Sequence, residues 1–285
     1  MEGSEILSLE VIEASLSTKI IGRAQRLDNL SNVNGDSSDL SKNELWDEID
    51  STNTRAAALA AQGCAEGVMV IARQQTAGRG RLGRAWISPP DAGISFSVVL
   101  RPKIELSRLP LITLATGVAV AQAIEASAGV RPGLKWVNDL TLSGRKLGGI
   151  LAEMPGQALI IGIGINVRLK ADELPEELKD KVEWLERAVG GPVDPNLIVM
   201  ELAHKLEAQY ELLKAGKTAE ILGLWRAYSV TIGQMIEARS ANQVITGKAI
   251  DIADSGALIV EAEDGTRTEL VAGEISIRLQ DGSYC

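Results

Sequence analysis

The 285-residue sequence contains few aromatic residues, only two cysteines and a single histidine. Aromatic residues make up 3% and hydrophobic residues 45% of the chain, so its core must consist of Ala, Val, Ile and Leu. That hydrophobic content excludes a disordered chain, and the length suits one large domain or two ordinary ones. Cys64 and Cys285 form neither a disulfide framework nor a metal-binding pattern, which indicates a reducing, cytoplasmic compartment.

Positive charge is also scarce. The chain has 29 Lys and Arg against 38 Asp and Glu, a formal net charge of −9, which excludes a generally basic surface for binding nucleic acid. Any anion-binding site must therefore be local. The N-terminus lacks the basic and apolar regions of a signal peptide. The longest apolar stretch, 109–124, is shorter than the roughly 20 residues of a bilayer-spanning helix and predicts a buried core helix.

Short apolar runs alternate with stretches of helical periodicity, and some connections are too short for crossovers. This pattern predicts an α+β fold, a mixed β-sheet with packed helices. The hydroxyls and carboxamide of residues 51–53 are expected to cap a helix. We expect strands over 68–72, 94–100, 134–141, 148–153 and 158–167. We expect helices over 7–17, 54–61 and 111–128, then an acidic helix started by a proline after residue 172, and helices over 196–214 and 218–228.

The chain divides into three parts by composition. Residues 1–44 comprise a helix and a polar insert, 28–43, that is dense in Asn, Asp and Ser and predicts a loop or a disordered segment. Residues 45–230 form the main domain. Residues 231–285 predict a small C-terminal β-barrel with short strands over 235–239, 244–250, 257–261, 267–271 and 275–279.

Three arginines, Arg79, Arg81 and Arg84, lie in one glycine-rich loop. The loop matches G-x-G-x-x-G, but a dinucleotide-binding fingerprint needs a helix there, and residues 86–90 (WISPP) cannot be helical. Three neighbouring guanidinium groups repel one another unless a polyanion joins them. We therefore expect a phosphate-binding loop that closes over its ligand, the alternative being a solvated basic loop.

A second charged group lies in a mostly apolar segment and comprises Lys135, Asn138, Asp139, Arg145 and Lys146. Burying such charges is costly unless they meet a charged ligand or a metal, although the Asn-Asp pair alone could be a turn. Glycines follow at 148–149 and in the strand 162–164, where missing side chains would let a ligand lie against the backbone. His204 is predicted to be structural, and the sequence contains neither a Ser-His-Asp triad nor a metal cluster.

Taken together, six segments resemble the biotin protein ligase family. Each is weak alone, but all occur in the family's order and span roughly residues 45–280, with Val137 where the family usually has proline. The segments are 51–53 (STN), 75–84 (QTAGRGRLGR), 135–139 (KWVND), 145–151 (RKLGGIL), 162–167 (GIGINV) and 273–278 (GEISIR). The resemblance implies a class II synthetase-like catalytic domain of the biotin–lipoyl ligase type, followed by the small β-barrel.

The resemblance also implies an activity. Such ligases use ATP and magnesium to convert biotin into biotinyl-5′-adenylate, and then transfer biotin to one lysine of the biotin carboxyl carrier protein of acetyl-CoA carboxylase. Some members also repress transcription through an N-terminal DNA-binding domain. Because only 50 residues precede Ser51, we expect a ligase without a repressor function, acting as a monomer or weak homodimer with no membrane partner.

Site roles follow from the matching positions. The resemblance assigns catalysis to Arg81, Lys146, Lys135 and Asp139, with magnesium expected near Asp139. It assigns biotin binding to Ser51, Thr52, Asn53, Gln75, Arg79, Gly80, Arg81, Lys146 and Gly149. It assigns ATP and adenylate binding to Arg79, Arg81, Trp86, Lys135, Asn138, Asn166 and Arg278.

Three other functions stay open at this stage. A lipoate or octanoate ligase or transferase shares the expected fold, although the arginine loop and the KWVND segment follow the biotin ligase pattern. A nucleic-acid-binding module could use the same loop, but the net charge of −9 and the few aromatic residues disfavour it. A non-catalytic biotin-binding protein would bind biotin without consuming ATP.

Overall fold

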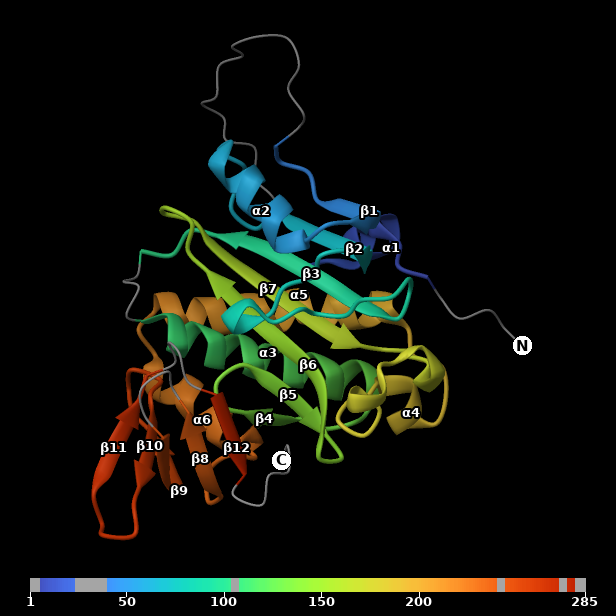
Figure 1. Cartoon of the computed structure of the whole chain (residues 1–285). Coiled ribbons are helices and arrows are strands. Elements are labelled where there is room, and N and C mark those ends of the chain that lie inside the picture. The colour runs from blue at the N-terminus through green and yellow to red at the C-terminus, as the bar shows by residue number, and fades with distance from the viewer. Residues whose placement is uncertain (1–5, 24–39, 104–107, 240–243, 272–275, 280–285) are drawn as a thin grey trace.

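A seven-stranded mixed sheet forms the centre of the main domain in the computed structural model, which describes residues 6–23, 40–103, 108–239, 244–271 and 276–279 (Figure 1). The strand order is β1-β2-β3-β7-β6-β5-β4, with β1 and β2 parallel and the other neighbours antiparallel. This confirms the predicted mixed sheet. The strands are β1 (Glu44–Ile49), β2 (Met69–Gln75), β3 (Gly93–Leu100), β4 (Gly133–Lys135), β5 (Asp139–Leu142), β6 (Arg145–Glu153) and β7 (Leu159–Asn166).

Helices cover both faces of the sheet. On one face Phe96 and Val98 of β3 pack into the main core with α3 (Leu109–Ala128), α5 (Pro195–Lys214) and α6 (Thr218–Tyr228). On the other face Val99 packs with Ala56 and Leu59 of α2 (Thr52–Ala61). Because successive side chains of a strand point to opposite faces, β3 contributes to both cores.

Helix α3 is the apolar helix expected for residues 111–128. By length and composition it could cross a membrane, but 72% of its apolar window is buried inside the fold. It begins with Pro110 in its first turn and ends at Gly129, whose φ of +68° is the left-handed conformation that closes many helices. The prediction of a buried core helix is confirmed.

The N-terminal segment packs against α5. Helix α1 (Leu9–Ser15) is capped by Ser8, and the backbone N–H groups of residues 19–21 donate hydrogen bonds to the carboxylate of Glu207. His204 Nε2 accepts a hydrogen bond from the backbone N–H of Ser17 at 3.1 Å, which is a structural role for this side chain. Most of the polar insert expected at 28–43 lies outside the described residues.

The C-terminal part is a separate antiparallel sheet in the order β11-β10-β9-β8-β12, beside the end of α6 (Figure 1, orange to red). Arg226 of α6 joins it through Nε, which lies 2.7 Å from Oδ1 of Asp251. The five short strands expected after residue 231 are confirmed. They are β8 (Met235–Arg239), β9 (Val244–Ile252), β10 (Leu258–Glu261), β11 (Arg267–Leu270) and β12 (Ser276–Leu279).

Two predicted elements differ in the structure. The single strand expected over 134–141 is split into β4 and β5 by a turn at residues 136–138, where the backbone and side chain of Asn138 both bond to Ile150. The acidic helix expected after residue 172 is replaced by 3-10 turns at Ala171–Glu173 and Glu176–Leu178 and a short α4 (Leu185–Val189). Pro175, extended at ψ 141°, separates the turns and prevents a continuous helix.

Strand β3 lies between β2 and β7 in the sheet and contributes buried side chains to both cores. Phe96 is 0% exposed, so Phe96→Ala should destabilise the protein by about 3–5 kcal/mol in denaturant unfolding. The control Val189→Ala, at a side chain that is 42% exposed, should change stability by less than about 0.5 kcal/mol. Equal effects of the two substitutions would show that Phe96 does not belong to the core described above.

Candidate active site

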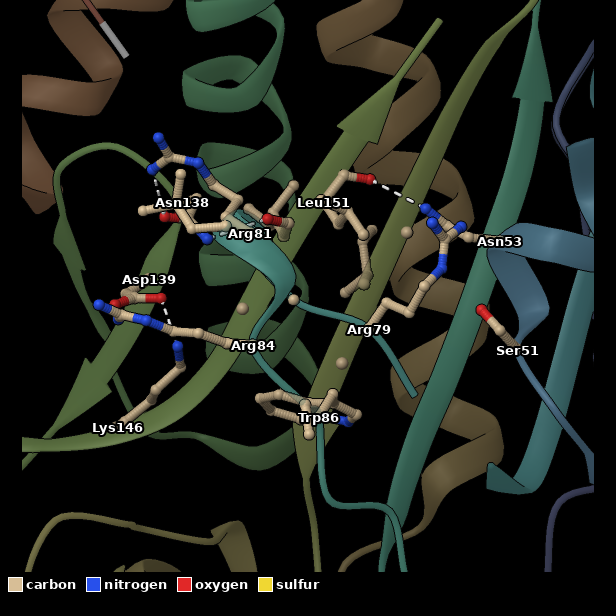
Figure 2. A pocket seen from close by; sticks show the side chains of 18 of the residues that line it. Ser51, Asn53, Arg79, Arg81, Arg84, Trp86, Asn138, Asp139, Lys146 and Leu151 are labelled. Carbon is tan, nitrogen blue, oxygen red and sulfur yellow. Dashed lines mark hydrogen bonds and ion pairs between the residues drawn. The ribbon is translucent and has the colours of Figure 1, made fainter. Parts of the chain in front are cut away.

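One cavity collects most of the side chains singled out by the sequence. It lies over β6 and β7 and is closed by the arginine loop (Figure 2). At one end, named the neutral end, the polar side chains of Ser51 and Asn53 lie beside Arg79 of the loop. At the other end, named the charged end, lie Lys146 and Asp139. The predicted residues that line it are Ser51, Thr52, Asn53, Gln75, Arg79, Gly80, Arg81, Trp86, Lys135, Asn138, Asp139, Lys146 and Gly149.

The neutral end is built from the first turn of α2. Ser51 caps this helix, as expected, and its Oγ accepts from the N–H of Thr54. The backbone N–H of Thr52 donates to Oε1 of Gln75 at 2.8 Å, and Ser97 Oγ donates to Oδ1 of Asn53 at 2.7 Å. Buried, mutually bonded amides and hydroxyls suit a neutral ligand group that offers both donors and acceptors.

Two glycines of β7 make room for protein side chains. A Cβ atom at Gly162 would lie 2.1 Å from Oδ1 of Asn53, and one at Gly164 would lie 2.5 Å from the ring of Trp86. Both glycines also line the cavity, so the expectation that a ligand lies against their backbone stays a prediction. They let Asn53 and Trp86 reach the positions from which both line the cavity.

The arginine loop is a short hairpin. Trp86 N–H donates to the carbonyl of Gly78 at 2.9 Å, and Gly80 N–H donates to the carbonyl of Arg84 at 2.7 Å. At its tip Leu82 and Gly83 both have positive φ, 57° and 70°, as a type I′ turn requires. No helix follows the hairpin, so the exclusion of a dinucleotide-binding fingerprint is confirmed. The hairpin lies over the cavity and is bonded at both ends of it, by Arg79 to Glu153 and by Arg81 to Asn138.

The charged end contains far more positive than negative charge. Arg81, Arg84, Lys135 and Lys146 line it together with Asp139, the single carboxylate among the described lining residues. Lys146 Nζ lies 2.6 Å from Oδ1 of Asp139. This excess of positive charge, in a chain with a net charge of −9, suits a polyanionic ligand.

Arg81 is more buried than Arg79 and Arg84, the other two arginines of the loop. Its side chain donates from one terminal nitrogen to Oδ1 of Asn138 at 3.1 Å. Burial lowers the pKa of its guanidinium, the carboxylate of Asp139 opposes that shift, and the nearby charge of Arg84 adds to it. A bound phosphate group would offset both burial and repulsion.

Two residues of the site escaped the sequence analysis. Glu153, at the end of β6, accepts from both terminal nitrogens of Arg79 at 3.1 and 3.0 Å and from Nδ2 of Asn53 at 2.8 Å. Ser97 is fully buried beneath Asn53. Ser95 and Ser97 alternate with apolar residues along β3, and that period of two was the available signal for a polar face.

Two predicted site residues do not line the cavity. Asn166 is buried, and its Nδ2 donates to the carbonyls of Glu183 at 3.0 Å and Lys146 at 3.4 Å, so it holds the backbone of Lys146 from behind. Arg278 lies on β12, opposite Glu237, and its side chain is outside the described part of the structure. Within the described residues, no group of three or more His, Cys, Asp or Glu side chains could hold a metal ion.

The contact between Arg79 and Glu153 should hold the hairpin closed. Glu153→Gln removes the charge that attracts Arg79, and such partly exposed pairs contribute up to about 1 kcal/mol, so trypsin should cleave the loop about threefold faster. Glu261→Gln, which breaks an exposed pair with Arg267, serves as the control and should leave that rate unchanged. An unaltered cleavage rate in Glu153→Gln would contradict this role.

Two family models match the chain. The model described as the Biotin/lipoate A/B protein ligase family matches residues 45–169. The model described as the Biotin protein ligase C terminal domain matches residues 231–278. The first match covers the sheet and the cavity, and the second covers the small C-terminal sheet.

Individual relatives agree with these matches. The bifunctional ligase/repressor BirA of Bacillus spizizenii is 40% identical over 226 residues, covering 78% of this chain and 70% of that protein. The biotin--[acetyl-CoA-carboxylase] ligase of Mycobacterium tuberculosis is 36% identical over 81% of this chain and 89% of its own length. The structure of the Aquifex aeolicus biotin protein ligase with biotin and ATP is 32% identical, with a TM-score of 0.76, over 84% of this chain and 100% of that chain. This chain therefore belongs to the biotin protein ligase family.

Proposed function

We propose that this protein is an ATP-dependent biotin ligase that activates biotin as biotinyl-5′-adenylate and transfers it to a lysine of a biotin carboxyl carrier protein. The observation that carries the proposal is the two-ended cavity, in which buried neutral groups adjoin a cluster of cations. Relatives named for biotin, and one solved with biotin and ATP, favour biotin over lipoate or octanoate.

In the proposed first step the ureido ring of biotin occupies the neutral end, on Ser51, Thr52, Asn53 and Gln75. Its carboxylate extends to Lys146, where one oxygen attacks the α-phosphorus of ATP and pyrophosphate leaves. Cations at this end offset the repulsion between the carboxylate and the phosphates and the charge that develops between them. In the second step the carrier lysine attacks the carbonyl carbon and AMP leaves.

The remaining assignments follow the same division of the cavity. Arg79, Gly80 and Arg81 close over the reactive anhydride and keep water from it. Lys135 and Asn138 contact the phosphates, and Gly149 contacts biotin through its backbone. Trp86 lies near adenine. Asn166 positions Lys146 through the hydrogen bond to its backbone carbonyl. Arg278 reaches the nucleotide from the small domain.

Magnesium is expected to arrive with ATP. Magnesium is usually held by one or two carboxylates together with substrate phosphates, and Asp139 supplies one carboxylate at the charged end, so the donor set fits. The ion would neutralise phosphate charge there. Asp139 would hold it, and the same carboxylate orients Lys146.

The proposed carrier is the biotin carboxyl carrier protein of acetyl-CoA carboxylase. We infer that residues 45–230 form the catalytic domain, that residues 231–285 form an accessory domain, and that the ligase acts in the cytoplasm as a monomer or weak homodimer. Nucleic acid and membranes are not among the proposed partners. These proposals rest on the family resemblance and on the local character of the cationic cluster.

The whole reaction can be tested by mass spectrometry. Apo carrier domain is incubated with the protein, ATP, magnesium and one acid, either biotin, lipoate or octanoate. A single addition of biotin at one lysine supports the proposal. Addition of lipoate or octanoate without biotin would place the protein with the other ligases of the fold, and binding of biotin without ATP consumption would make it a binding protein.

Lys146 should be essential to adenylate formation. Lys146→Ala removes the cation that lies 2.6 Å from Asp139 at the charged end, and the rate of adenylate formation should fall about 100-fold or more. Circular dichroism should show an intact fold. Lys248→Ala, at an exposed position of β9, is the control and should retain full activity. Wild-type adenylation by Lys146→Ala would remove this lysine from the mechanism.

Arg81 should retain the intermediate. Arg81→Gly removes the hydrogen bond to Asn138 and loosens the closed loop, so the adenylate should escape and label bystander lysines. Labelling of an added non-carrier protein, detected with streptavidin, measures the escape. The matched control is Arg267→Gly, at an exposed position of the small domain. Unchanged carrier specificity together with unchanged retention of adenylate would refute this role.

A further inference from the structure

A tight turn of the small C-terminal domain reaches into the main domain. The turn spans residues 253–257, between β9 and β10, and is closed by Ala253 N–H to the Ala257 carbonyl at 2.9 Å and by Gly256 N–H to the Ala253 carbonyl at 2.8 Å. Asp254 and Ser255 at its tip are exposed, whereas Gly256 and Ala257 are buried. The turn therefore packs against the main domain through Gly256.

Gly256 accepts a hydrogen bond from a residue of the cavity. Its carbonyl oxygen lies 3.0 Å from the indole Nε1 of Trp136, which is 4% exposed. Trp136 lines the same cavity as Lys135, Asn138 and Asp139. A buried indole N–H needs a partner, so loss of this contact would leave an unsatisfied donor beside the cavity.

The same glycine lies against the start of α3. A Cβ atom at Gly256 would lie 2.8 Å from the backbone nitrogen of Leu111 and 3.0 Å from the backbone carbon of Pro110. Neither backbone atom can move without moving the helix. Gly256 also has a φ of +86°, a conformation that favours glycine. Shape and conformation thus both require glycine at this contact.

A second bond ties the same segment to the small domain. The backbone N–H of Trp136 donates to Oγ1 of Thr231 at 2.9 Å, and Thr231 is itself buried. Thr231 is the first residue matched by the C-terminal family model. The segment 135–139, which includes Lys135, Asn138 and Asp139, is therefore fixed at two points through the main chain and the side chain of Trp136.

We propose that the Gly256 turn is a positioning element for the charged end of the cavity. Through Trp136 it sets the place of residues 135–139, and thereby the affinity for the triphosphate of ATP. Gly256 does not itself line the cavity. The neutral end is built on α2 and β3, and within the described residues none of its hydrogen bonds reaches the small domain, so biotin binding is independent of the turn. The assignment of ATP and biotin to the two ends rests on the proposed function.

The structure offers a matched pair of substitutions. Gly265, in the turn between β10 and β11, has a φ of +83°, close to that of Gly256, but no atom lies within 4 Å of a Cβ placed there. Gly256→Ala and Gly265→Ala therefore impose the same backbone strain on the same domain. They differ in the contact with Leu111 and Trp136.

The first readout is independent of activity. In protein labelled with ¹⁵N-tryptophan, the five tryptophans give five indole signals, and Trp136→Phe identifies the signal of Trp136. That signal should shift in Gly256→Ala and stay in place in Gly265→Ala. A signal that does not move in Gly256→Ala would overturn the proposed link.

The second readout separates positioning from general damage. In Gly256→Ala the KM for ATP should rise about tenfold, in line with couplings of 1–2 kcal/mol between contacting elements, while the Kd for biotin stays within about twofold. Gly265→Ala should keep both constants. Parallel loss of biotin and ATP affinity in Gly256→Ala, or no change in either, would overturn the proposal.

The test also covers two other cases, a Gly256→Ala variant that does not fold and a wild-type protein that does not use ATP with biotin. If Gly256→Ala does not fold, Trp136→Phe removes the indole N–H and leaves the Gly256 turn intact, and it should raise the KM for ATP without weakening biotin binding. If the wild-type protein does not use ATP with biotin, the proposed function fails. The positioning proposal is then decided by the indole signal and by direct titration of ATP.

Discussion

The repulsion among clustered cations is the constraint on which the site depends. Arg81, Arg84, Lys135 and Lys146 share one end of a cavity with Asp139, in a chain with a formal net charge of −9. Such a cluster persists only if the fold holds it in place and a polyanion compensates it. The arginine hairpin, strands β6 and β7 and the small domain all help to hold these cations in place.

The side chains of the neutral end are positioned by close packing and hydrogen bonds. Glycines of β7 leave space for Asn53 and Trp86, and the fully buried Ser97 fixes the amide of Asn53 from below. Glu153 then bonds to both Asn53 and Arg79, so the neutral end and the closing loop share one carboxylate.

The sequence predicted most strands and helices because their apolar periodicity is strong, and motif spacing identified most residues of the cavity. It missed the break between β4 and β5, since the turn there depends on bonds from Asn138 to Ile150, which lies on the next strand but one. Local composition likewise suggested one acidic helix where Pro175 separates short turns. Glu153 and Gly256 act through partners more than 70 residues away, and no local pattern reveals such contacts.

The central claim is that the cavity joins a carboxylate to a nucleotide at its cationic end. Exchange of labelled pyrophosphate into ATP, measured with biotin and, in parallel, with lipoate and octanoate, tests that claim most directly. The account predicts exchange that depends on biotin. Exchange with lipoate but not biotin would contradict the assignment of the substrate. No exchange with any of the three acids, from folded protein, would show that the cationic end binds phosphate for another purpose.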